Sequence, residues 1–319
     1  MIASYSARLA ILCFASFFLI HLALGLLSLR LSSWFTRLSR SMRPQGVSSI
    51  SIFMRLAPAC LSTLSVIAVC VPSYLRYEGN SANEEIGLLC LVPGCLGFLI
   101  CLIAFTRATY AVVQSASLTR RLCIAEQSGS WYLNQEEDGF PSLALVGLFK
   151  SKVVVSPSVL KILTAEQFQA ALDHERAHRS SGDNFKRLLI LLSPDLLPFI
   201  RSFRAIESLW ERSAELSADD LATRGQPSSS IALAEALIKL ARQGRQTPAP
   251  LVSGLFAVPE GLAVRVERLL RPDPATEILP SSTRLIWPGI SLPLVASAFV
   301  LPHLQVLQGV HHLLESLLR

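Results

Sequence analysis

Four long apolar stretches constrain what this chain can fold into more than any other feature of its sequence. Each approaches the roughly 20 residues that cross a bilayer as a helix. The 319 residues are 51% hydrophobic and only 16% charged, a composition too apolar for an ordinary soluble enzyme. We therefore predict an α-helical membrane protein, with three transmembrane helices in residues 1–106, at about 9–29, 56–75 and 86–106, and a fourth in residues 284–319 followed by a short tail.

The first apolar stretch has an alternative interpretation as a secretory signal peptide. Its apolar run is longer than the roughly 7–15 residues of a signal core, and no small-x-small cleavage site follows it. We therefore expect residues 9–29 to be retained as a membrane helix.

The charged residues between the apolar stretches predict an orientation, because Lys and Arg accumulate on the cytoplasmic side of a membrane. The first connecting segment is purely basic and the second is mainly acidic: Arg30, Arg37, Arg40, Arg43 and Arg55 against Arg76, Glu78, Glu84 and Glu85. The N-terminus is then expected outside a bacterial inner membrane, and residues 107–283 in the cytosol. The net charge of +6 reflects this bias and contact with anionic headgroups, so it requires no nucleic acid.

Six of the seven cysteines lie in the predicted membrane helices, and Cys123 stands alone in the segment that follows. Cys90, Cys95 and Cys101 lack the spacing of a zinc site. Small packing residues are therefore a better interpretation than metal ligands or disulfide partners.

Residues 174–178 are His-Glu-Arg-Ala-His, which is an HExxH pattern. Residues four apart share one face of a helix, so His174 and His178 can bind one zinc ion, with Glu175 beside it to take a proton from its water. Glu215, in a second predicted helix, is the candidate third ligand, and Asp219 lies one turn further on the same side. The alternative is a pair of surface histidines, with Glu215 and Asp219 merely solvated. The coincidence of these residues predicts one zinc ion per chain.

The segment around this pattern has the signals of short strands followed by helices. Strands are predicted at residues 122–125, 143–148 and 153–155. Thr164 and Gln167 form a capping box, so the helix with both histidines should begin at Ala165, and Gly182 should end it. Further helices are predicted at 205–224, 231–242 and 264–270.

Residues 186–200 are apolar but are interrupted by Pro194 and Pro198. This stretch is too short and too broken for a membrane span. We expect it to form a buried helix pair or to lie against the membrane.

The residues from about Leu143 to Ala222 resemble those of the BlaR/MecR-type membrane metallopeptidases. The similarity includes residues 154–157, 174–178, 182–184 and 214–219, and a more distant one is to the HtpX and CAAX-prenyl endopeptidases. The resemblance implies an α+β zincin-like metallopeptidase domain in residues 107–283, between the third and fourth transmembrane helices. It also implies roles for single residues: His174, His178 and Glu215 as zinc ligands, Glu175 as general base, and Asp219 as the residue that orients a ligand histidine.

These features predict an integral-membrane zinc endopeptidase whose partners are the lipid bilayer and a protein or peptide substrate. In signal transduction that substrate would be a regulatory protein such as a transcriptional repressor. The alternatives are a quality-control protease for membrane proteins and a non-catalytic metal-binding sensor or scaffold. Glu175 argues against the sensor or scaffold, because a pure binding site needs no base. The absence of acidic residues from the predicted spans argues against a transporter.

The sequence offers only weak candidates for the remaining parts of a protease site. The strand at 143–148 could hold an extended substrate by edge pairing. Asn184 and Arg224 are candidates for stabilising an oxyanion.

Overall fold

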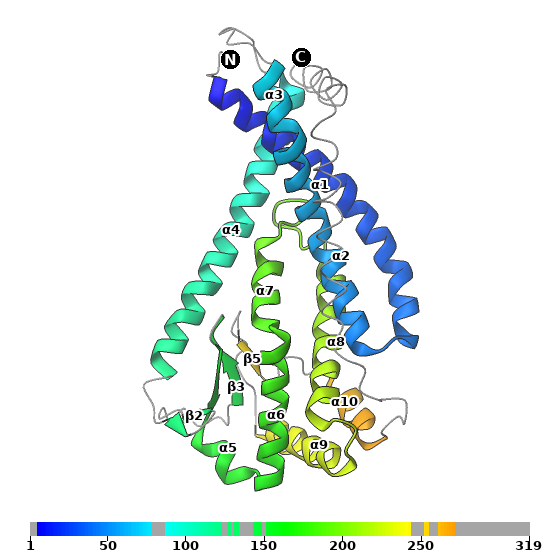
Figure 1. Ribbon diagram of the computed structural model, residues 1–319, viewed down its shortest axis with the longest axis vertical. Helices are drawn as coiled ribbons and strands as arrows, with labels where there is room; N and C mark the ends of the chain where they lie inside the picture. The colour runs from blue at the N-terminus through cyan, green and yellow to red at the C-terminus, as the bar shows by residue number, and fades with distance from the viewer. Residues whose placement is uncertain are drawn as a thin grey trace.

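A computed structural model describes residues 5–77, 87–122, 127–128, 131–133, 143–148, 151–243, 252–254 and 261–271. Three long helical stretches converge at one end of the molecule and diverge toward the other (Figure 1). They are long and apolar enough to cross a membrane: Tyr5–Ser41, Pro44–Tyr77 and Leu88–Arg120. Three membrane helices were predicted in this part of the chain, and by length and composition the structure has them. The predicted fourth span, in residues 284–319, lies outside the described residues.

The long stretches are built from several helical elements. The first is α1 with the short η1, the second contains a π-helical segment η2, and the third is α4: α1 Tyr5–Leu38, η1 Ser39–Ser41, α2 Pro44–Ser65, η2 Val66–Cys70, α3 Val71–Tyr77 and α4 Leu88–Leu122. α1 and α4 approach closely at Gly97, where a Cβ atom would collide with the carbonyl oxygen of Phe14. Cys70 and Cys90 are buried in the apolar cluster between these helices.

α4 continues well past the predicted end of the third span at residue 106. The strand predicted at 122–125 is wrong at Leu122, which is the last residue of α4, and residues 123–125 lie outside the described part of the chain. No glycine or proline occurs between Phe98 and Leu122 to end the helix. The helix therefore carries the chain from the membrane-spanning region to the sheet.

The sheet lies at the wide end of the molecule and has the strand order β1-β2-β4-β3-β5. β2 and β4 are parallel, and the other neighbours are antiparallel. The strands are β1 Gln127–Ser128, β2 Trp131–Leu133, β3 Leu143–Val146, β4 Lys152–Val155 and β5 Val252–Gly254. The predictions at 143–148 and 153–155 are confirmed as β3 and β4, but β1, β2 and β5 were not predicted. Edge pairing of a substrate with β3 is ruled out, because β4 and β5 occupy both of its sides.

Six helices complete this end of the molecule: α5 Pro157–Ile162, α6 Ala165–Ser181, α7 Asp183–Leu192, α8 Arg204–Thr223, α9 Pro227–Arg242 and α10 Leu262–Leu270. The capping box of Thr164 and Gln167 opens α6, and Gly182 ends it in the left-handed conformation with φ 67°, as predicted. α9 begins four residues before the predicted start at 231, because Pro227 occupies the first turn, where a missing N–H costs nothing.

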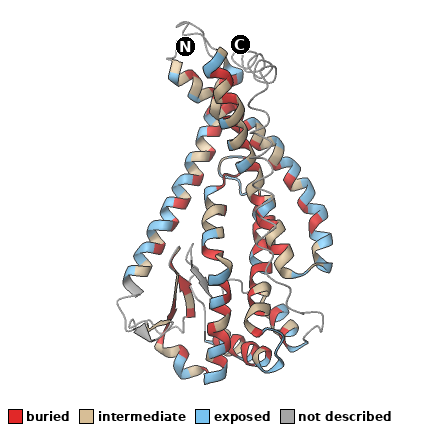
Figure 2. Ribbon diagram, in the orientation of Figure 1, coloured by how far each residue is buried: buried red, intermediate tan, exposed pale blue. Residues whose placement is uncertain are grey.

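An apolar core joins the sheet to α6 and α9 (Figure 2). Val155, Val159, Ala171 and Leu233 are fully buried in it. At roughly 25 cal/mol per Å² of apolar area removed from water, such burial is the main force that fixes α6 against the sheet. It therefore sets the position of the helix that carries the HExxH residues.

Residues 186–200 form one helix end and a loop, so the predicted helix pair is wrong. α7 ends at Leu192, and residues 193–203 form a turn that returns the chain to α8. Pro194 and Pro198 explain the difference, because neither can continue a helix ladder. α7 and α8 lie between α2 and α4 in Figure 1, so the loop reaches up among the membrane-spanning helices.

Two arginines, the buried Arg55 and the partly exposed Arg107, fasten this loop to the spans. Arg55 of α2 donates to Glu207 Oε1 at 2.9 Å and to the backbone oxygen of Ser193 at 2.8 Å. Arg107 of α4 lies 3.0 Å from Asp195 Oδ2. Arg55 therefore does not belong to the first connecting segment, where the sequence analysis placed it. We call the set Arg55, Arg107, Asp195, Arg201 and Glu207 the arginine junction.

Candidate metal centre

The HExxH residues face α8 from the middle of α6. His174 and His178 are one turn apart on α6, and Glu215 is in the middle of α8. Their candidate ligand atoms lie within 4.8 Å of one another, so among the described residues these three form a group that could hold a metal ion. The side chains are buried, with Glu215 only 2% exposed. The structure thus brings together all three residues that the sequence named as ligands.

The distances in this group fit a metal ion. The two Nε2 atoms are 3.1 Å apart, and the carboxylate of Glu215 lies 3.6 Å from His174 Nε2 and 3.5 Å from His178 Nε2. A tetrahedral ion about 2.0–2.1 Å from two ring nitrogens would hold them roughly 3.3 Å apart. The donors therefore occupy the corners that one small cation needs.

Each histidine is oriented by a carboxylate on its other ring nitrogen. His174 Nδ1 lies 2.9 Å from Asp219 Oδ1, and His178 Nδ1 is 2.7 Å from Asp183 Oδ2. A carboxylate beside Nδ1 favours a proton on that nitrogen and leaves the Nε2 lone pair free to bind a metal. When both Nδ1 atoms carry the proton, the two Nε2 lone pairs face each other, and a proton or a metal cation between them would remove their repulsion.

Asp183 reaches His178 because of the turn at Gly182. The left-handed glycine ends α6, and Asp183 begins α7 directly afterwards. Lys186, one turn further, lies 2.9 Å from the other oxygen of Asp183. Asp183 is one of the residues that carry the family resemblance, but no role was predicted for it. A glycine followed by an acidic residue just past the HExxH helix is a pattern from which this role could have been predicted.

Arg265 of α10 holds the carboxylates on α8. It donates to both oxygens of Asp219, at 2.8 and 2.7 Å, and lies 3.0 Å from Glu215 Oε2. From the sequence, Arg265 was predicted only to lie in the helix at 264–270. No local pattern could have found it, because 46 residues separate it from Asp219.

The buried charges in this cluster do not balance. Four carboxylates (Asp183, Glu175, Glu215 and Asp219) face two cations (Lys186 and Arg265), which leaves a net charge of −2 when the histidines are neutral and the carboxylates ionised. Burial alone would lower the pKa of His178, but Glu215 and Asp183 raise it to about 10. The site therefore favours additional positive charge, which protons on the two histidines or a bound divalent cation would supply.

Glu175 lies beside the ligands without being one of them. Its side chain is fully buried, and neither carboxylate oxygen has a hydrogen-bond partner in the described part of the molecule. Burial raises its pKa to about 7, against the opposing effect of the two histidines. An unpartnered carboxylate with a pKa near neutrality is suited to take up and release a proton.

The two oxyanion candidates are not brought to the centre. The Asn184 side-chain amide donates to the backbone oxygens of Leu145 at 3.2 Å and Gly147 at 2.9 Å, so it fastens α7 to β3. Arg224 is exposed and follows the last residue of α8, about two and a half turns beyond Glu215. Asn184 is therefore a structural residue, and Arg224 lies at the far end of its helix.

Comparisons with known proteins add no name to this arrangement. No protein-family model matches the chain, and no curated protein matches it. The function is therefore inferred from the residues and their geometry.

Proposed function

We propose that this protein is an integral-membrane zinc endopeptidase. The observation that carries the proposal is the convergence of two histidines and a glutamate, with a second carboxylate, that of Glu175, beside them and without a hydrogen-bond partner among the described residues. Two nitrogens and one carboxylate are a donor set that zinc accepts, and three protein ligands leave a position for water. The family resemblance of residues 143–222 points the same way. Membrane attachment is supported by the three long apolar helices.

His174, His178 and Glu215 would hold the ion. A zinc ion bound there supplies a Lewis acid that polarises a peptide carbonyl and lowers the pKa of a water molecule. Glu175 accepts the proton of the attacking water and later donates it to the leaving amine. Asp219 and Asp183 keep the two imidazoles in the tautomer that binds metal, and Arg265 keeps Asp219 and Glu215 in place.

An extended peptide would bind along β5 in this proposal. β5 is an outer strand of the described sheet and contacts both α6 and α7. Its free edge can accept a substrate backbone as an additional strand, a mode that selects for unfolded or extended segments. This replaces β3, the strand that the sequence analysis suggested.

A protease is favoured over a non-catalytic metal sensor or scaffold because Glu175 is buried without a partner. Burying a carboxylate without a hydrogen-bond partner costs free energy, and a site that only binds metal has no need of such a group. Regulated cleavage of a repressor and quality control of membrane proteins share the same chemistry, so both remain within the proposal.

The test combines metal analysis with a peptidase assay on the full-length protein. We expect about one zinc per chain in the wild type and its loss in the His174→Ala, His178→Ala double variant. Glu175→Gln should keep the metal, and its rate of casein cleavage should be roughly 10²–10⁴-fold lower than that of the wild type. Glu166→Gln, an exposed change on the same helix, is the matched control and should leave both unchanged. Stoichiometric zinc in the double variant would disprove the assignment of the ligands.

The proposed orientation has its own test. A reporter fused near Gln135 should behave as cytosolic, and one fused after Arg319 as external, because the arginines from Arg30 to Arg43 hold the first connection inside. A Gln135 reporter that faces outward would contradict this orientation. The substrates would then be envelope proteins, and a cytosolic repressor would be excluded.

A further inference from the structure

The loop between α7 and α8, residues 193–203, is packed against the membrane-spanning helices on its inner side. Leu196, Phe203 and Ile206 form a buried apolar cluster with Leu22 and Leu29 of α1 and Met54 of α2. Gly25 of α1 makes room for Leu196, whose side chain would collide with a Cβ atom there. The loop is therefore a fixed part of the helical bundle.

The outer side of the same loop is apolar and exposed. Leu197, Phe199 and Ile200 are 41%, 87% and 56% exposed. Phe199 also has φ 64°, a conformation that costs energy for a bulky residue. The backbone at Phe199 therefore adopts an unfavourable conformation that exposes the aromatic ring, and no burial within the described chain offsets the free energy this costs.

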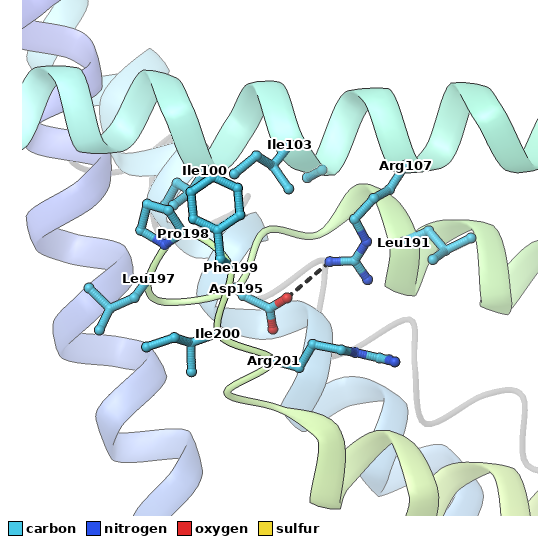
Figure 3. Close-up of a pocket in the computed structure, with 11 residues that line it drawn as sticks. Ile100, Ile103, Arg107, Leu191, Asp195, Leu197, Pro198, Phe199, Ile200 and Arg201 are labelled. Carbon is cyan, nitrogen blue, oxygen red and sulfur yellow. Dashed lines mark hydrogen bonds and ion pairs between the residues drawn. The ribbon is translucent and has the colours of Figure 1, made fainter.

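This tip lies at the level of the apolar part of α4. A cavity of about 380 Å³ is formed between the loop and Ile100, Ile103 and Ala104 of α4. Figure 3 shows Phe199 and Pro198 beside Ile100, with Arg107 further along the helix. Seven residues separate Ile100 from Arg107, the first charged residue of α4, which corresponds to roughly 10 Å of helix.

The exposed surface of α4 continues the apolar surface of the loop. Phe98, Leu102 and Phe105 are all exposed at this level. In a helix that spans a membrane, such residues face lipid. The tip of the loop is therefore continuous with a surface that lipid covers.

Basic residues follow the apolar tip directly. Arg201 and Arg204 are exposed, and Arg107 lines the cavity from the other side. Arg201 and Arg107 also pair with Glu207 and Asp195 in the arginine junction. Long arginine side chains near a membrane interface place their charged ends at the level of the phosphates, while apolar neighbours enter the hydrocarbon. The order of apolar and basic residues therefore matches the two layers of a phospholipid leaflet.

We propose that residues 197–200 insert into the hydrocarbon of the adjacent leaflet, and that the cavity beside α4 holds a phospholipid acyl chain. Lipid is the better occupant, because the cavity is lined by Ile100, Ile103 and Ala104 of α4 and adjoins the exposed apolar surface of the same helix. The metal-carrying helices are then anchored to lipid as well as to the spans. This inference depends on the membrane-spanning helices and not on the metal centre.

The experiment places the photoreactive residue p-benzoylphenylalanine at Phe199 in the full-length protein, reconstituted in phosphatidylcholine and phosphatidylglycerol vesicles. After irradiation, mass spectrometry of the peptides shows what was captured. Phe105 on α4 serves as the lipid-facing reference, and Val264 on α10, which is 58% exposed at the other end of the molecule, is the control. We expect the Phe199 peptide to gain the mass of one phospholipid, as the Phe105 peptide does, while the Val264 peptide does not.

Two outcomes would overturn the proposal. One is capture of protein at Phe199, which would assign the surface to a substrate helix or a second copy of the chain. The other is no adduct at Phe199 when Phe105 captures lipid. The same substitution at Leu197, with thermal unfolding compared with the wild type, guards against a local folding defect. Lipid capture at Leu197 in a normally folded variant supports insertion, and its absence there counts against it.

Discussion

The metal centre and the arginine junction both gather charged side chains beside α8, which carries Glu215 of the first and Glu207 of the second, but they are completed differently. In the junction, the two carboxylates of Asp195 and Glu207 meet three arginines, and Arg55 also donates to backbone oxygens at the end of α7. In the metal centre, Glu175 is buried with no hydrogen-bond partner among the described residues, and the Nε2 atoms of His174 and His178 are 3.1 Å apart. The side chains of the protein complete the junction, whereas the metal centre keeps an unpartnered carboxylate beside three donors that could hold a metal ion. Buried charge alone therefore does not indicate a ligand site, but a group of metal-donor atoms beside an unpartnered carboxylate does.

The largest effect is expected from opening the junction. Arg55→Met would leave Glu207 buried beside one remaining arginine, and breaking a buried pair costs roughly 3–5 kcal/mol. Chemical unfolding in detergent micelles should show this loss, with Arg37→Met, an exposed arginine of α1, as the control. The folded fraction should still bind one metal ion per chain.

A double variant sharpens that comparison. Arg55→Met with Glu207→Gln removes both charges, so it should recover part of the lost stability. If Arg55→Met instead folds normally but loses metal, the junction and the metal centre are not independent clusters.

An intermediate effect is expected from the carboxylates that orient the histidines. Asp183→Asn and Asp219→Asn keep the shape of the side chain but weaken the hold on the Nδ1 proton, so metal affinity should fall by about 10–100-fold. Competition with a chromophoric chelator measures the affinity. Asp173→Asn, directly before His174 but paired with Arg176 on the surface, is the control. Equal affinity in all three variants would show that the carboxylates do not tune the centre.

The smallest effect is expected where charges are exposed. Arg271 and Glu267 form a pair one turn apart on α10, with side chains 82% and 65% exposed. Arg271→Ala should change the free energy of unfolding by less than about 0.5 kcal/mol, because water and salt screen such pairs. A much larger loss in the same unfolding experiment would mean that the end of α10 has a role beyond this pair.

The parts of the centre that the sequence predicted are those set by spacing along one helix. His174, Glu175 and His178 share α6, and Glu215 and Asp219 share α8, so helical periodicity was enough to place them. The contribution of Arg265 depends on how α10 packs on α8, and no periodicity records that packing. Asp183 lies between these cases, since it is close in sequence but acts only through the turn at Gly182.

The same distinction applies to the fold. Long apolar stretches predicted the spans, and the capping box predicted the start of α6 to the residue. β2 and β5 have three residues each and are strands only because they pair with β4 and β3. The loop after α7 was predicted as a helix because it is apolar. Its apolar residues instead pack against α1 and α2 or are exposed, and they do so without forming a helix.

The complete burial of His174 and His178 has a kinetic consequence. A chelator, like a peptide substrate, could reach an ion in this centre only when α6 and α8 separate locally, so metal would leave only as fast as the site opens. The rate of inactivation by a chelator should therefore rise with chelator concentration and then level off at the opening rate. The metal content of such a site would depend on the metal that was available when the protein folded, and it would respond only slowly to later changes in the free metal concentration.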